Sequence, residues 1–188
     1  IYLLNNKPGS AMKSLNAAKS IYSKDKETYK HELYDIELMR ARALSQANKT
    51  EEALALLAQY PPDPMINRLR ADISWQSGLW EDAAEALQDL ILDQALDLKR
   101  PLTSEQADMI LHRAVALNLS SNRVALTNMR KRYGDAMKKT ARAKLFEVVT
   151  RSRQSAMLTD RETLQSIVSE VDIFKDFLES YRNSGVSN

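Results

Sequence analysis

The two histidines are the side chains of this 188-residue sequence best suited to binding a metal ion. Asp108 and His112 are four positions apart, so on a helix they share one face and could supply two ligands. A third ligand at matching spacing is missing, and His31 lies far away in the sequence. We therefore expect an ordinary pair on a helix surface, with no metal site and no cofactor.

The serines and glycines lack the surroundings that catalysis requires. No serine has the histidine and acid order of a catalytic triad or a glycine-rich elbow around it. The four glycines are isolated, so no glycine-rich loop could hold a phosphate group. The absence of cysteine excludes disulfides, thiol nucleophiles and Cys-bound metals. The expectation is a protein that is not an enzyme.

The composition favours helices. There are only 4 Gly and 5 Pro, 44% of the residues are apolar, and no run shows β-branched alternation. The apolar stretches are too short for a transmembrane segment. A net charge of +2 is too small to indicate nucleic-acid binding by itself. A bacterial cytoplasm and a periplasm are both compatible with a chain lacking cysteine, so the compartment stays open.

Small residues recur at helical spacing along the chain. Four alanines each precede a Leu or Met by four residues: Ala11 with Leu15, Ala53 with Leu57, Ala83 with Leu87 and Ala125 with Met129. Three of the four follow an earlier alanine by eleven or twelve residues, namely Ala41, Ala71 and Ala114. Methyl side chains on two joined helices let their backbones approach closely. The pattern predicts a stack of helical hairpins.

We expect about nine helices, joined by short turns. Their predicted ranges are 11–22, 32–47, 51–59, 63–77, 79–97, 103–119, 123–134, 136–152 and 161–182. Residues 1–5 have the pattern of the last turn of a helix whose start is missing, as in a piece of a longer protein. The expected helix signals are a Pro8-Gly9 turn with Ser10 as cap, a Thr50 cap, a left-handed Gly78, and capping boxes at Thr103 with Gln106 and Thr159 with Glu162.

These residues resemble tetratricopeptide (TPR) repeats, whose pattern includes A-x3-F and a following Pro. The best copy runs from Ala41 through Ala53 to Leu57, with prolines after it, and the second runs from Ala71 through Trp80 to Leu87. The resemblance covers roughly 1–133. It implies an all-α, right-handed superhelical stack of antiparallel hairpins, within a longer bacterial TPR protein. No repeat has Gly at the small site, and Ser74 replaces the usual Tyr.

The resemblance also implies a function: non-catalytic binding of another protein or a peptide in a concave groove. In TPR-like proteins the first helix of each hairpin lines this groove. Carried onto this sequence, the lining is Asp35, Leu38, Met39, Arg42, Gln46, Arg68, Asp72, Trp75, Gln76, Leu111, His112 and Asn118. Trp75 is compatible either with a place in the core or with an exposed anchor for a partner. The set lacks the Lys/Asn/Arg combination that clamps a C-terminal carboxylate.

A basic segment at 130–153 supports an alternative function. It holds nine Lys or Arg against two acids, and its patch comprises Arg130, Lys131, Arg132, Lys138, Lys139, Arg142 and Lys144. It could form a solvated face, or it could dock on RNA, an anionic membrane surface or an acidic partner. Aromatic residues are not interleaved with the cations as single-stranded nucleic acid would require, so nucleic acid is the less favoured partner.

The end of the chain carries a wide apolar stripe. Its residues recur at helical spacing: Leu164, Ile167, Val168, Val171, Phe174, Leu178 and Tyr181. We expect a helix pair over 134–183 that caps the array, possible self-association through 159–182, and a frayed tail at 184–188. A second alternative follows from this arrangement, namely an array that only acts as a structural spacer and has no separable ligand.

Overall fold

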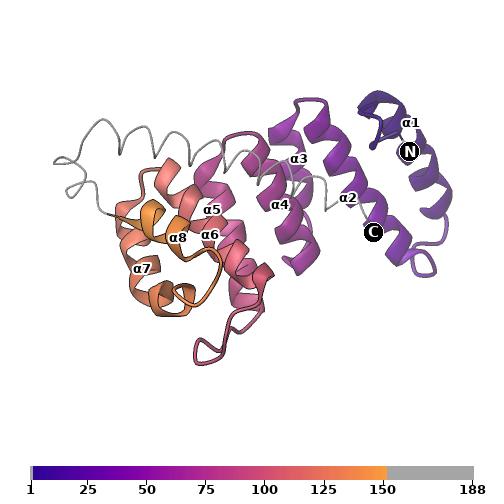
Figure 1. Cartoon of the computed structure of the whole chain (residues 1–188). Coiled ribbons are helices and arrows are strands. Elements are labelled where there is room, and N and C mark those ends of the chain that lie inside the picture. Colours follow the sequence, from indigo (N-terminus) through magenta and orange to yellow (C-terminus); the bar gives the residue numbers. More distant parts are fainter. Residues whose placement is uncertain (1, 152–188) are drawn as a thin grey trace.

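The computed structural model describes residues 2–151, and this part of the chain is all-α. Figure 1 shows the helices following one another along the molecule, with α1 at one end and α7 and α8 at the other. No strand occurs within residues 2–151. The eight helices are α1 (Pro8–Tyr22), α2 (Lys30–Gln46), α3 (Thr50–Leu57), α4 (Pro64–Gln76), α5 (Trp80–Asp93), α6 (Ser104–Leu119), α7 (Arg123–Met137) and α8 (Ala143–Thr150).

One turn geometry occurs four times along the chain. Its central residue has a left-handed backbone, and these residues are Asn6 (φ 50°), Asn48 (φ 59°), Gly78 (φ 71°) and Ser121 (φ 60°). The N–H of each donates to the carbonyl three residues back, and the next N–H donates to the carbonyl five residues back. This is the Schellman motif that ends a helix. A new helix begins two residues after each turn, so the turns divide the chain into repeated units.

The predicted alanines take fixed places relative to these turns. Ala41, Ala71 and Ala114 lie seven residues before a turn residue and are buried. Ala11, Ala53 and Ala83 lie five residues after one and are also buried. In the fourth unit the residue at that place is Leu126, which is buried, whereas Ala125 is only half-buried. The prediction that Ala125 takes this place was wrong. It requires a turn one residue shorter than the others, whereas the turn at Ser121 has the same length as the other three.

Within residues 2–151 the helices pack mainly against their neighbours in sequence, and α2 also packs against α4 and α6 against α8. The buried apolar residues fall into two clusters. One lies in α2, α3 and α4 and includes Ala41, Ala53 and Ile66. The other extends from Ala71 in α4 to Phe146 in α8. This sequential packing is compatible with a helical repeat.

Several predicted helix ends are confirmed. Gly78 is the left-handed residue after α4, and the ring of Trp80 lies beside it. The helix predicted from residue 63 begins one residue later, at Pro64, and Asp63 is its cap. Thr103 and Gln106 form the predicted capping box at the start of α6. Local sequence signals were therefore sufficient at these positions.

Other predicted ends near the start of the chain are wrong. Helix α1 begins at Pro8, because proline fits the first helical turn, so Pro8 and Gly9 are helical and Ser10 is no cap. The Thr50 side chain caps no backbone group of α3, since its hydroxyl contacts the Ser77 hydroxyl at 2.8 Å instead.

The second half also differs from the expected ranges. Helix α5 ends at Asp93, four residues before the predicted end, and Ala95 in the following loop has a left-handed φ of 43°. Helix α7 continues through Gly134 to Met137, because Tyr133 and Met137 on either side are both buried. The predicted boundary between 133 and 134 therefore falls within a helix. The expected helix 161–182, its capping box and most of the 134–183 unit lie outside the described residues.

None of the helices within residues 2–151 is long and apolar enough to span a lipid bilayer.

Candidate partner-binding surfaces

Three ion pairs join the row of helices on which the predicted groove residues lie. Arg42 of α2 approaches Asp72 of α4 at 3.5 Å. Arg68 of α4 approaches Glu105 of α6 at 3.0 Å. On the next helix along, Arg142 at the start of α8 lies 2.6 Å from Asp108 of α6. These pairs link α2 to α4, α4 to α6, and α6 to α8, and we call these four helices a row.

Most of the predicted groove residues are accessible on this row. Asp35, Met39, Arg42, Arg68, Gln76 and Asn118 are exposed, and Leu38, Gln46, Asp72 and Trp75 are half-buried. Some of their side chains form hydrogen bonds within the chain. Gln46 donates to the Leu3 carbonyl at 3.0 Å, and Asn118 donates to the Val149 carbonyl at 2.7 Å. A partner would therefore meet a face that is already partly paired.

Leu111 and His112 do not belong to this face. Both are buried, with exposed fractions of 0% and 5%. Their helix, α6, packs against α5, α7 and α8 at once, so little of its surface reaches solvent. The prediction that these two residues line a groove is wrong for this reason.

The rings of Trp75, Trp80 and His112 form one cluster. The Trp75 ring meets the Trp80 ring nearly at right angles, with centroids 5.4 Å apart, and lies 5.5 Å from the His112 ring. Edge-to-face pairs of this kind stabilise a core beyond their buried area. Trp75 is half-buried and packs on the larger apolar cluster. It therefore lies at the edge of the core and presents only part of its ring to the face.

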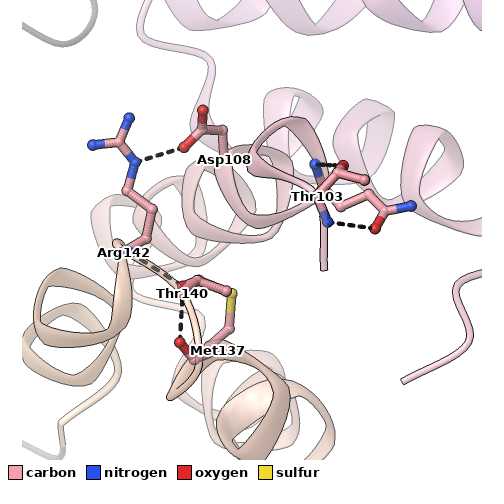
Figure 2. A network of polar contacts seen from close by, with 6 residues as sticks. Thr103, Asp108, Met137, Thr140 and Arg142 are labelled. Carbon is pink, nitrogen blue, oxygen red and sulfur yellow. Dashed lines mark hydrogen bonds and ion pairs between the residues drawn. The ribbon is translucent and has the colours of Figure 1, made fainter. Parts of the chain in front are cut away.

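Burial controls the protonation of His112. Removal from water lowers the pKa of its imidazole to about 4, while Asp108 raises this pKa and Arg142 lowers it. The side chain is therefore neutral at pH 7. Asp108, one helical turn before His112, forms an ion pair with Arg142, as Figure 2 shows. Within residues 2–151 no group of three or more His, Asp or Glu could hold a metal ion.

Arg142, in the turn between α7 and α8, belongs to the predicted basic patch but is paired with Asp108. The Thr140 hydroxyl donates to the Met137 carbonyl at 2.8 Å and accepts the Arg142 N–H at 3.2 Å (Figure 2). This closed turn aims the Arg142 guanidinium at Asp108, so Arg142 fixes α8 on α6. Lys138 pairs with Asp135 at 2.8 Å. The remaining patch residues are exposed: Arg130, Lys131, Arg132, Lys139 and Lys144. Arg153 of the basic segment lies outside the described residues.

A groove between α5 and α7 was not predicted. It comprises a hollow of about 310 Å³ and an adjoining one of about 140 Å³, and Ile91, Leu92, Arg132 and Tyr133 line both. Spacing could have indicated its walls, because Gln88 and Leu92 share a face of α5 and Ala125 and Arg132 share a face of α7. We call it the α5–α7 groove.

The fold thus defines an all-α protein whose eight described helices pack on their neighbours, in a manner compatible with a helical repeat. Comparison of the chain with protein-family models, with curated proteins and with solved structures finds no match in any of the three. The likeness to TPR repeats therefore depends on the residues quoted above and on the repeated turns.

Proposed function

We propose that this protein is a non-catalytic scaffold that binds another protein or a peptide. In this proposal its helices form a TPR-like, right-handed stack of antiparallel hairpins, with α2, α4, α6 and α8 as the first helix of successive units. The four identical turns, each followed by a new helix after two residues, support this arrangement. Such arrays present extended surfaces that suit docking.

The observation that carries the functional proposal is the mixed, accessible face of α2 and α4. Met39 exposes 47% of its surface there, although it is apolar. Asp35 and Arg42 lie on the same helical face, at four residues before and three residues after it. Arg68 and Gln76 of α4 are exposed on the next helix. An apolar side chain surrounded by charged groups is the composition of a protein-binding surface.

Site-specific photocrosslinking tests the proposal in the full chain. With p-benzoylphenylalanine in place of Met39 or Gln76, irradiation in the native host should give the same discrete protein adduct from both positions. The control is Val124 of α7, which is 75% exposed but lies off this row of helices. Absence of an adduct at Met39, or the same adducts at Val124, would contradict binding at this face.

A specific observation favours a second candidate function, docking through the basic patch. Arg130, Lys131, Lys139 and Lys144 are exposed, and none forms an ion pair with the residues that the structure describes. Four phosphate contacts would weaken binding roughly 100-fold between about 50 and 200 mM salt. Titration of a duplex RNA and of phosphatidylserine vesicles at these two salt concentrations measures this. Docking on α2 and α4 should change little over the same range.

A further inference from the structure

Helices α5 and α7 carry opposite charge. Residues 71–98, which include α5, contain seven acidic residues and no Lys or Arg. Residues 123–144, which include α7, contain eight Lys or Arg against one acidic residue. The two helices lie side by side, because Gln88 of α5 and Asn128 of α7 line the same hollow of the α5–α7 groove. One surface of the molecule therefore joins an acidic helix to a basic one.

The charged side chains beside this groove are accessible. Glu85 and Glu81 precede Leu92 by seven and eleven residues, so they share the side of α5 that lines the groove. Arg132 of α7 lines the groove directly, and Lys131 is the residue before it. These four charged side chains are exposed, and none of them forms an ion pair with another residue that the structure describes. Their charges therefore remain available to a partner.

We propose that a second copy of this chain docks on this surface and forms a twofold dimer. A twofold axis that lies in the surface, between α5 and α7, places α5 of each copy across α7 of the other. Glu81 and Glu85 of one copy then face the basic residues Lys131 and Arg132 of its partner, and the same contact occurs twice. Because both patches of both copies are used, the assembly closes as a dimer.

Charge complementarity selects a second copy as the occupant. The surface requires a partner that presents a cationic helix next to an anionic one, and this chain itself has that arrangement. Opposite charges across an interface fix its orientation, whereas stacking α5 on α5 would oppose like charges and weaken binding. Exposed ion pairs are screened by salt, so the dimer should dissociate more readily as the ionic strength rises.

Leu92 provides a contact that is specific to the twofold arrangement. It is 52% exposed and lines both hollows between α5 and α7, so it lies close to the axis and to Leu92 of the partner copy. The sequence contains no cysteine. In the full chain, Leu92→Cys should form a disulfide-linked dimer about tenfold faster than Met39→Cys, which is 47% exposed but lies on α2. Equal rates for the two variants would overturn the proposal.

Charge reversal tests the docking by sedimentation equilibrium of the full chain. The acid-reversed variant is Glu81→Lys with Glu85→Lys, and the base-reversed variant is Lys131→Glu with Arg132→Glu. Each variant alone opposes like charges, so its dimer dissociation constant should rise by about tenfold. An equimolar mixture of the two variants opposes unlike charges again. The mixture should therefore form a mixed dimer with an affinity close to that of the parent.

A matched control separates docking from the change in net charge. Lys24→Glu with Lys26→Glu, exposed in the loop between α1 and α2, should dimerise like the parent. Circular dichroism checks that every variant is folded. A parent that stays monomeric throughout the concentration series, or a mixture that associates no more than its components, would overturn the proposal. Loss of duplex RNA binding by the base-reversed variant, with a monomeric parent, would assign these cations to that ligand instead.

Discussion

At the scale of single residues, His112 shows how burial changes a group that the sequence presents as a surface ligand. Its ring packs on Trp75 and is 5% exposed, so the cost of burying a charge lowers its pKa to about 4. The unfolded chain protonates this histidine near the ordinary value of 6.5. Between these two values the unfolded state binds more protons, so stability falls as the pH falls.

Replacing His112 should remove that pH dependence. His112→Phe keeps an aromatic ring beside Trp75 but has no titratable group. Relative to the parent, the variant should gain up to about 3 kcal/mol of stability as the pH falls from 7 to 4. Urea unfolding at intervals across that range measures the difference. His31→Phe, at an exposed position, is the control and should follow the parent. A constant difference between His112→Phe and the parent at all pH values would contradict this account.

The buried alanines set how closely joined helices approach. Ala53 and Ala83 have no exposed surface, so Ala53→Phe or Ala83→Phe must separate two helices, at a cost of about 1–3 kcal/mol or more. Ala55→Phe, on the exposed side of the same helix as Ala53, should change stability by less than about 0.5 kcal/mol. Thermal unfolding compares the three variants. If Ala53→Phe and Ala83→Phe unfold at the same temperature as the parent, these alanines do not lie at helix contacts.

At the scale of elements, the left-handed turns determine where one helix ends and the next begins. Gly78 has φ +71° with the Trp80 ring 3.9 Å from the position of an added Cβ, whereas Gly134 lies inside α7 with open space around it. Gly78→Ala should therefore lower stability by about 1 kcal/mol, and Gly134→Ala should raise it by about 0.5–1 kcal/mol. Chemical unfolding of both variants checks the opposite signs. Two changes of the same sign would show that one turn or helix is misplaced.

The same elements show how much the sequence could predict. Gly78 and the Thr103–Gln106 pair are local signals, and their helix ends follow from hydrogen bonds that satisfy the backbone groups near those ends. Gly134 suggested an end that does not occur, because tertiary burial of its neighbours outweighs the preference of one glycine. The turn over 120–122 was predicted, but the left-handed backbone of Ser121 was not, since serine rarely adopts it.

The candidate surfaces were less predictable than the helices. Leu111 and His112 are buried because α6 is covered by three helices, including one from a later unit. No pattern within α6 reveals that third neighbour. The α5–α7 groove likewise depends on how two helices separated by 29 residues stand beside each other. Contacts between elements decide such features, and a single sequence specifies them only through its complete fold.

At the scale of the whole molecule, packing is close to one-dimensional. The cluster within α2, α3 and α4 shares no residue with the cluster that extends from α4 to α8. Within residues 2–151 the helices contact mainly their neighbours in sequence, and α2 also packs on α4 and α6 on α8. In such an array each unit is stabilised by its own contacts and by those with adjacent units. Damage to one end should therefore leave the other end largely intact.

Hydrogen exchange read by mass spectrometry tests this architecture most directly. The full-length Ala53→Phe variant carries its defect within the first cluster, between α2 and α3. Our account predicts faster exchange in α2 and α3, decreasing through α4, with the protection of α6, α7 and α8 within about twofold of the parent. A uniform loss of protection from α1 to α8 would show a single cooperative core and would contradict the repeat.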